Sequence, residues 1–165
     1  MATWSGIRYK LENDYLAVSL RGHIQYYCTS YNKSPDHHGR ASIRLDGQEL
    51  ISGCYWNNWS KAHLFPRDET YEKRMTENYA YVDETALKLG VFSEKAFYRA
   101  FQEFDNQSIE KSLNSDDLIV KIFAVLDRRV GKRRLQSMKE KLNPEDEIFN
   151  MFYNIRIHAE HIRFS

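Results

Sequence analysis

Cysteine and long apolar runs are both scarce in this sequence, and each shortage excludes a class of protein. Two cysteines in 165 residues, Cys28 and Cys54, are too few for a disulfide framework and lack metal-site spacing. No apolar segment approaches the roughly 20 residues of a membrane helix, and the first residues lack the charged start and apolar run of a secretory signal. We therefore expect a cytoplasmic protein with reduced thiols and no membrane contact.

An excess of charge of one sign is also missing, because the net charge is only +1. The distribution is uneven: residues 1–67 hold 8 basic and 5 acidic side chains (+3), residues 68–117 hold 6 and 12 (−6), and residues 118–165 hold 10 and 6 (+4). The whole molecule therefore has no strong attraction for a polyanion. Two interpretations stay open: the acidic middle third neutralises the basic residues within the molecule, or they bind an external anionic partner.

What the sequence does have is enough apolar material for a core. Hydrophobic residues make up 42% and aromatic residues 14%, which excludes a disordered chain. At 165 residues the length fits one domain, in which folding hides roughly 70% of the surface of the extended chain. We expect a single domain over residues 1–165.

The first third predicts an antiparallel sheet. After a short helix capped by Thr3 or Ser5, residues 15–21, 23–31, 40–46 and 48–52 read as strands that turn signals separate. Among these signals, Asp46-Gly47 is the strongest, because a two-residue hairpin turn needs positive φ at both positions. Alternation directs Ile24, Tyr26, Cys28, Ala41, Ile43 and Leu45 to one face of the sheet.

From residue 54 onward the pattern is helical. Apolar residues at helical spacing predict helices over residues 68–89 and from a cap at Ser93 to Phe104, and residues 108–113 form a short link. Ser115 is the expected cap of a helix that ends near Arg128 and Arg129. Gly131 predicts a turn into a short helix. The sequence Asn143-Pro144-Glu145-Asp146 starts a last helix that runs to the chain end, with one packed face made by Ile148, Phe152, Ile155, Ala159 and Ile162.

Strands give way to helices once, which favours the α+β class over a doubly wound sheet. The prediction is a mainly β segment at residues 1–53, with three or four strands in a meander. This sheet packs on a helical array within a mainly α segment at residues 54–165.

Five cations near Gly131 form the most unusual surface feature, which we call the basic corner: Arg128, Arg129, Lys132, Arg133 and Arg134. The corner lacks the spaced glycines of a phosphate-binding loop and follows a helix instead of a strand. Its cations can nevertheless contact phosphates or carboxylates. Asp127, directly before two arginines, is expected to position them through bidentate pairing and not to act as an acid or base.

A second candidate surface is the other face of the sheet, where Tyr27 and Tyr31 lie beside Arg40 and Arg44. Rings and guanidinium groups interleaved on a sheet can stack and hold single-stranded bases. The alternative is a face covered by helices. No RNA-binding-domain motif is present.

Enzyme chemistry finds little support in the residue pattern. There is no G-x-S-x-G nucleophile motif, and an inert buried thiol is the better interpretation of each cysteine. His158 and His161 share a helix but lack the spacing of a zinc protease. We nominate no catalytic residue, metal ligand or cofactor.

The chain resembles an uncharacterised family of small bacterial cytosolic proteins along nearly its whole length. Their motifs are a Trp-Ser start at residues 4–5, P-D-x-x-G-R at 35–40, G-V-F-S-x-x-x-F-Y at 90–98, S-I-E-x-S-L at 108–113, L-D-R-R-V-G-K-R-R-L at 126–135 and F-Y-x-x-R-x-x-A-E at 152–160. The resemblance implies the same fold and location and carries over no catalytic residue. It places Arg156 and Glu160 in the shared pattern, one helical turn apart, where a structural ion pair is expected.

The sequence therefore predicts a non-catalytic interaction or regulatory module that uses the basic corner. Its partner is an unidentified protein or anionic ligand, and its oligomeric state stays open. Direct nucleic-acid binding through the basic corner and the sheet face is the alternative, and an enzyme ranks third.

Overall fold

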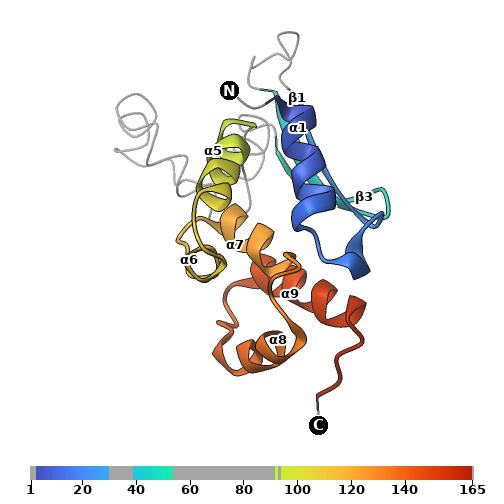
Figure 1. The fold of residues 1–165 in the computed structure, drawn as a ribbon, viewed down its shortest axis with the longest axis vertical. Coiled ribbons are helices and arrows are strands. Elements are labelled where there is room, and N and C mark those ends of the chain that lie inside the picture. Colours follow the sequence, from blue (N-terminus) through green and yellow to red (C-terminus); the bar gives the residue numbers. More distant parts are fainter. Residues whose placement is uncertain (1–2, 30–38, 54–91, 93, 165) are drawn as a thin grey trace, which may run out of the picture.

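The computed structural model describes residues 3–29, 39–53, 92 and 94–164 (Figure 1). The predicted helix at residues 68–89, the expected cap at Ser93 and the candidate residue Tyr31 lie outside the described residues. The N-terminal half contains α1 (Trp4–Tyr9), the π-helix η1 (Lys10–Tyr15), the 3₁₀ helix η2 (Val18–Leu20), β1 (Ile24–Thr29), β2 (Arg40–Leu45) and β3 (Gln48–Gly53). The C-terminal half contains α5 (Glu94–Asp105), α6 (Ile109–Leu113), α7 (Leu118–Val125), α8 (Lys132–Met138), the 3₁₀ helix η3 (Lys139–Lys141) and α9 (Glu147–Ala159).

The three described strands form an antiparallel meander in the order β1-β2-β3, as predicted. Ile24 pairs with Leu45, Tyr26 with Ile43 and Cys28 with Ala41, so the residues assigned to one face are cross-strand neighbours. The turn between β2 and β3 places Asp46 at φ 50° and Gly47 at φ 84°, both in the left-handed region that a type I′ turn requires. The Asp-Gly signal therefore fixed this hairpin correctly.

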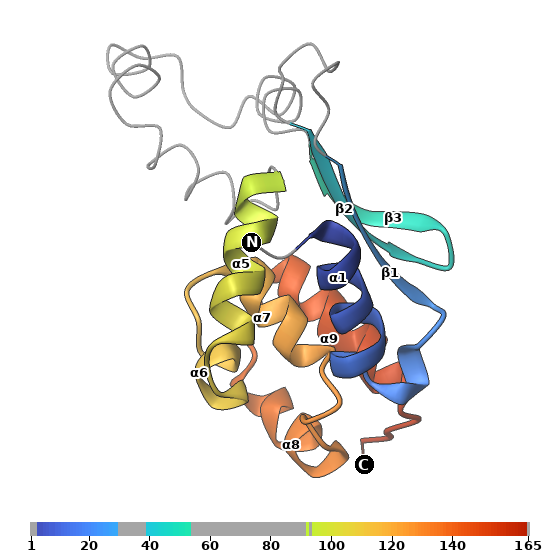
Figure 2. The same cartoon turned by 45° about the horizontal axis from the view of Figure 1, so that its top comes forward.

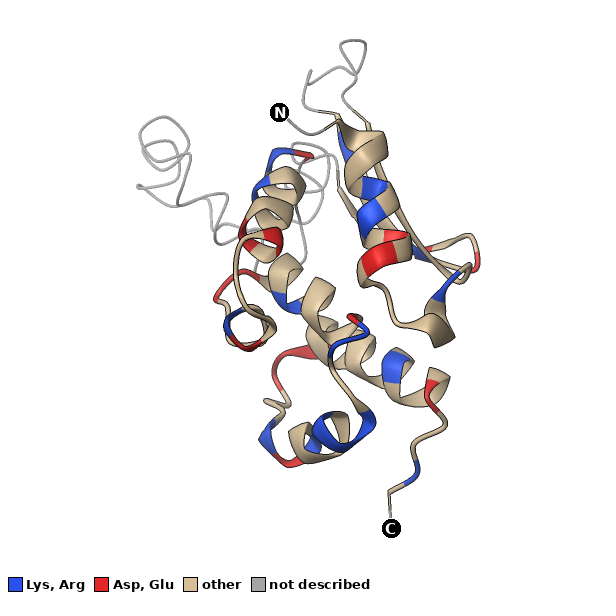
Figure 3. Cartoon of the chain, viewed as in Figure 1, with Lys and Arg blue, Asp and Glu red and all other residues tan. Residues whose placement is uncertain are grey.

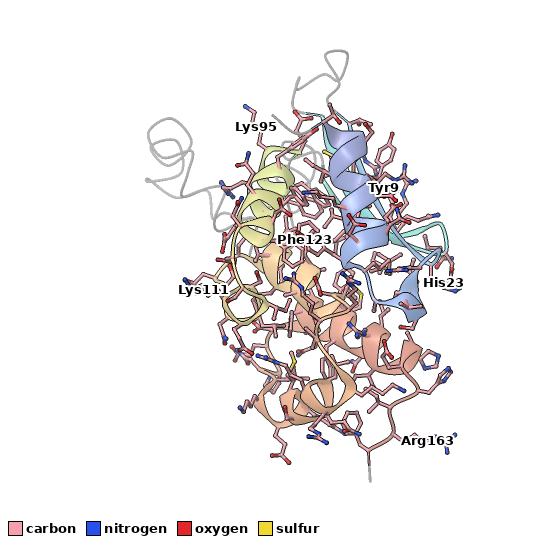
Figure 4. The ribbon with its side chains drawn as sticks, viewed as in Figure 1. Tyr9, His23, Lys95, Lys111, Phe123 and Arg163 are labelled. Atoms are coloured by element: carbon pink, nitrogen blue, oxygen red, sulfur yellow. The ribbon has the colours of Figure 1, made fainter. Side chains whose placement is uncertain are left out.

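One face of the sheet packs on helices through aromatic rings. Tyr26 of β1 lies edge-on to Phe97 of α5 and Phe123 of α7, with ring centroids 6.2 and 5.4 Å apart. Phe104 of α5 reaches the Phe123 ring from the other side, at 5.6 Å. Figure 2 shows α1 beside the strands and α5 and α7 on the other side of α1, and Figure 4 shows Phe123 in the interior. The α+β architecture is confirmed.

The strand predicted at residues 15–21 is wrong. The chain there completes η1, passes through an isolated antiparallel bridge between Leu16 and Asp127, and turns into η2. Leu16, Ala17 and Leu20 are all buried. These apolar residues pack against the segment after α7. The tertiary contact therefore overrides their local preference for a strand.

Two helix boundaries also differ from prediction. The short link at residues 108–113 is the helix α6, whose cap Ser108 accepts a hydrogen bond from the Lys111 amide at 3.2 Å. Helix α7 is capped by Asp117 and not by Ser115, since the Asp117 carboxylate accepts from the Ile119 amide at 2.9 Å. Because α7 ends at Val125, the cations that follow lie in a loop and not in its last turn.

The turn at Gly131 and the short helix after it are confirmed as α8. Helix α9 begins later than expected, because the Asn143 side chain accepts from the Glu145 amide (3.0 Å) in a turn that delays the helix to Glu147. It also ends before the chain does, at Ala159. The packed face differs too: the buried residues of α9 are Phe149, Phe152, Tyr153, Arg156 and Ile157, whereas Ile148, Ile155, Ala159 and Ile162 are half-buried.

In the part of the chain that the structure describes, every helix is too short or too polar to cross a lipid bilayer.

Candidate functional site

The basic corner lies on the loop between α7 and α8, which apolar residues hold in place. Leu126 and Val130 are completely buried, while the neighbouring Arg128 and Arg129 are exposed. Helix α8 then begins at Lys132, with Gly131 as its N-cap. The buried residues therefore anchor the loop while its cations face outward, and Figure 3 shows Lys and Arg on α8 and on the loop before it.

The N-terminal segment fixes one side of this loop through main-chain hydrogen bonds. The Ala17 amide donates to the Leu126 carbonyl at 2.9 Å, and the Arg128 amide donates to the Tyr15 carbonyl at 2.8 Å. These two bonds flank the bridge between Leu16 and Asp127. Segments more than 100 positions apart in the sequence are thus paired as a minimal antiparallel ladder.

Arg156 of α9 fixes the other side. Its side chain is 3% exposed, and its guanidinium group donates to the carbonyls of Val125 (3.1 Å), Asp127 (2.7 Å) and Val130 (2.8 Å). A planar group with five donors in a fixed fork suits this task, because it reaches three carbonyls of one loop at once. Arg156 therefore determines the path of the backbone that carries the corner.

Glu160 balances the charge of Arg156. The Arg156 Nε donates to Glu160 Oε1 at 3.0 Å, the i,i+4 pair that the sequence predicted, and Ser19 Oγ donates to the same oxygen at 2.7 Å. Burial lowers the pKa of Arg156, opposed by the nearby carboxylate. Burial acts to raise the pKa of Glu160, but the Ser19 hydrogen bond and the Arg156 charge outweigh it, so this pKa lies below its ordinary value.

Asp127 pairs with Arg129, so the bidentate role predicted toward both arginines is confirmed for Arg129 and not for Arg128. It is fully buried and accepts from the Arg129 amide (2.7 Å), Nε (3.0 Å) and Nη2 (2.9 Å). The guanidinium group also lies over the rings of Tyr15 and Phe104, 5.1 and 5.6 Å from their centroids. The hydrogen bond to Asp127 raises the pKa of Arg129. This arginine is therefore engaged by its own chain.

Arg134 is engaged as well. Its guanidinium group forms a bidentate pair with Glu110 of α6, with Nη2 at 2.6 Å from Oε2 and Nη1 bonded to Oε1. Glu110 belongs to the acidic middle third of the chain, so part of the neutralisation within the molecule is real. The acidic residues at positions 68–84 lie outside the described residues.

The other three cations of the corner, Arg128, Lys132 and Arg133, are exposed. Considering only the residues described, none of the three forms a hydrogen bond or an ion pair through its side chain. Lys132 is close enough to Glu160 to contribute to the lowered pKa of that carboxyl. The candidate surface is therefore these three residues, which we call the open cations.

Two further cations next to the corner were missed by sequence reasoning. Lys139 and Lys141 of η3 are exposed, and the Lys139 ammonium lies 3.9 Å from the centroid of the Phe164 ring. The interval from Lys132 to Lys139 is seven residues, two helical turns, so both fall on one side of α8 and its extension. This spacing was the available signal, hidden by the focus on the cluster around Gly131.

The Tyr/Arg face of the sheet does not join the basic corner. Arg40 and Arg44 both bind Glu49 of β3, at 2.6 and 3.1 Å, and Arg44 lies over the Tyr27 ring at 4.7 Å. The hydrogen bond from Arg40 is the main reason that the pKa of Glu49 is lowered. Figures 1 and 2 both place α8 at the end of the molecule away from the strands. The two predicted surfaces are therefore separate, and the sheet arginines already have a carboxylate partner.

In the described residues, no group of three or more His, Cys, Asp or Glu side chains is arranged to hold a metal ion. Cys28 is a buried free thiol, and burial raises its pKa to about 12. The thiolate form that nucleophilic chemistry requires is therefore suppressed at neutral pH.

Comparison with known proteins gives one result. A family model described as the SF0329 protein family matches residues 3–157, which includes the basic corner and the Arg156–Glu160 pair. Neither the curated proteins nor the solved structures contain a match to the chain.

Proposed function

The chain belongs to the SF0329 protein family, and we propose that it is a non-catalytic interaction module whose open cations dock an acidic segment of a partner protein. One observation carries the proposal. Arg128, Lys132 and Arg133 are exposed and, among the described residues, form no hydrogen bond or ion pair through their side chains, although the loop beneath them is held on both sides.

The fixed backbone favours binding because little of it has to be ordered when a partner arrives. The loop is already held by two main-chain bonds from residues 15–17 and by three bonds from Arg156. Side-chain ordering costs about 0.5–1.5 kcal/mol for each long side chain, but the backbone adds little to this cost. The backbone of the loop is held in place, while its cationic side chains are exposed. This arrangement suits partners of different sequence that carry several carboxylates.

Charge numbers favour a protein partner over a nucleic acid. The three open cations, with Lys139 and Lys141, present five positive charges, and Glu140 lies among them. Specific DNA-binding proteins contact roughly 6–10 phosphates. A short acidic peptide needs fewer contacts, and exposed charge pairs of this kind contribute about 0.2–1 kcal/mol each.

Nucleic-acid binding through the same open cations is the second candidate, and their exposure is what favours it. The sheet face adds little to this candidate, because Glu49 occupies both of its arginines. The proposal takes the module to act in the cytoplasm, as the sequence predicts, where its buried Cys28 stays reduced.

The test uses two fluorescent probes of matched length, a 12-residue Glu/Asp-rich peptide and a 12-nucleotide single strand of DNA. Binding of each is measured by anisotropy for the wild-type chain and for R128Q/K132Q/R133Q. The matched control is R21Q/K95Q/K111Q, which removes the same charge from exposed cations elsewhere; Figure 4 shows Lys95 and Lys111 at the outer edge of α5 and α6.

The proposal expects the wild-type chain to bind the acidic peptide, the first triple variant to lose about tenfold in affinity, and the control to change less than twofold. Equal losses of affinity in both triple variants would show that the effect depends only on net charge. This result would contradict a docking site at the open cations. A stronger and equally corner-dependent affinity for the DNA strand would replace the proposal with its alternative.

A further inference from the structure

A groove runs along α9, and none of the basic corner's open cations is among its described lining residues. Its volume is about 1020 Å³. Helix α9 forms one wall, and residues 19–23 together with the β2–β3 turn form the other. His23, at the right-hand edge of the molecule in Figure 4, marks the second wall. A space of this size is comparable with the largest ligand sites of small domains.

The wall from α9 has a regular chemical pattern. Glu147, Met151, Ile155 and Ala159 follow one another at steps of four and form an apolar row with one acidic end. A parallel row of Asn150, Asn154 and His158 lies one position before each apolar residue. The α9 wall therefore carries an apolar row, which we call the floor of the groove, beside a row of hydrogen-bonding side chains.

The row packs against the core with only part of its surface. Ile155 and Ala159 belong to the stripe that the sequence predicted to be packed, yet both are only half-buried, as is Met151. Leu20 and Leu45 face the groove from the other wall. Apolar area that a folded chain leaves open over several residues marks an interaction surface more often than a packing defect.

The length of the row sets the size of an occupant. Twelve positions separate Glu147 from Ala159, or about 18 Å along a helix. A partner helix of about three turns matches this length and can place two or three apolar side chains on the floor at spacing i, i+3 or i+4, and i+7. Methionine suits such a floor because its unbranched side chain adapts to different shapes.

The charged side chains that line the groove favour an occupant with positive charge. Among the described residues, its lining includes the carboxylates of Asp46 and Glu147 and no Lys or Arg. Asp46 is bonded to His23 at 2.7 Å, and within the described residues Glu147 has no ion-pair partner. Asn150 Oδ1 is buried and, in the same described set, accepts no hydrogen bond, while its Nδ2 donates to the Asn143 carbonyl at 2.8 Å. An occupant with a cationic side chain can pair with the Glu147 carboxylate.

We propose that this groove binds an amphipathic helical segment of a partner protein, with apolar side chains on the Met151–Ile155–Ala159 row and a Lys or Arg near Glu147 or Asp46. This inference goes beyond the proposed function, because it uses another surface and a ligand of opposite charge. Either can fail without the other.

The test is a selection from a displayed library of random 12-residue peptides on the immobilised full-length chain, with removal of peptides that also bind M151E/I155E. The enriched peptides, or winners of the selection, are expected to carry apolar residues at helical spacing and at least one Lys or Arg. A synthetic winner should lose more than tenfold in affinity for M151E/I155E and about threefold or more for E147K. It should bind Y9E, a control that alters a tyrosine 63% exposed on α1, like the wild-type chain.

Because the double variant introduces two charges into a half-buried row, E147K keeps the test independent of folding. A winner that binds E147K as tightly as the wild-type chain, an acidic consensus, or no enrichment at all would overturn the inference. Retained binding by R128Q/K132Q/R133Q is expected and separates this site from the basic corner.

Discussion

The guanidinium group of Arg156 donates to the carbonyl of Asp127 at 2.7 Å, across 29 positions of sequence. The same side chain binds the carbonyls on either side of that position, at Val125 and Val130. A buried arginine thus does for the loop after α7 what a neighbouring strand does within a sheet: it donates to three main-chain carbonyls, of which that of Asp127 also accepts from the Val130 amide. The shape of the basic corner depends on this one side chain.

Replacing Arg156 with Met is therefore expected to lower the free energy of unfolding by about 3 kcal/mol or more, because three carbonyls and the Glu160 carboxylate lose the donor that Arg156 supplies. Urea denaturation measures the change. Arg156→Lys keeps the charge but not the fork, and should recover less than half of the loss. A loss below 1 kcal/mol for R156M would contradict the role given to Arg156.

The pKa of Glu160 predicts a pH dependence. In the folded chain this pKa is lowered from its ordinary value of about 4.5. A carboxyl with a lowered folded pKa contributes stability that is present above the unfolded value and is lost as the pH falls through the folded value. Urea denaturation between pH 7 and pH 3 should therefore show a fall below about pH 4.5 that is shallower in E160Q. Identical slopes in the two proteins would rule out this contribution.

Asp127→Asn tests the buried pair with Arg129. The substitution keeps the shape of the side chain but removes its charge and places an amide where three donors converge, so the free energy of unfolding should fall by about 1–3 kcal/mol. Thermal unfolding measures the loss. Asp116→Asn, at an exposed site, is the control and should change little. Equal stability of D127N and the wild-type chain would show that the pair contributes nothing.

The ring cluster predicts a larger effect. Phe123 is 2% exposed and lies within 5.6 Å, centroid to centroid, of Tyr26, Phe97 and Phe104. Phe123→Ala should cost about 3–5 kcal/mol of stability through lost burial and the cavity left behind. Phe164→Ala, at a ring 38% exposed, should cost less than about 1 kcal/mol. Similar losses of stability in the two variants would contradict the assignment of Phe123 to the core.

Two glycines offer a test with opposite signs. Gly47 has φ 84°, where any side chain strains the backbone, so Gly47→Ala should destabilise the chain by about 1 kcal/mol. Gly6 lies within α1, and an added Cβ would meet its nearest atom, Thr3 Oγ1, at an ordinary 3.4 Å. Gly6→Ala should therefore stabilise by up to about 1 kcal/mol. Changes of the same sign would be inconsistent with these backbone assignments.

Sequence reasoning recovered what depends on local chemistry. The Asp46-Gly47 turn, the alternation of β1, and the phenylalanine stripe of α5 each follow from neighbours within a few positions, whereas β2 does not alternate because Ser42 is fully buried. The bidentate role of Asp127 was also predicted, because a carboxylate directly before arginines has few other partners within reach.

It failed where distant segments decide the outcome. Residues 15–21 have strand composition, but their partner is one residue pair of a loop more than 100 positions away, which periodicity does not reveal. The face of α9 was misassigned because a buried arginine occupies a core position that hydrophobicity gives to isoleucine. The sequence likewise did not show which cations of the basic corner bind Asp127 and Glu110. Only the fold shows that they are Arg129 and Arg134.

The most direct test of the central claim is the salt dependence of the affinity for the Glu/Asp-rich 12-residue peptide, measured from 50 to 200 mM salt. If the open cations form the docking surface, R128Q/K132Q/R133Q should flatten the slope of log Kd against log salt concentration, while R21Q/K95Q/K111Q should keep the wild-type slope. Equal slopes for the wild-type chain and both triple variants would contradict the account.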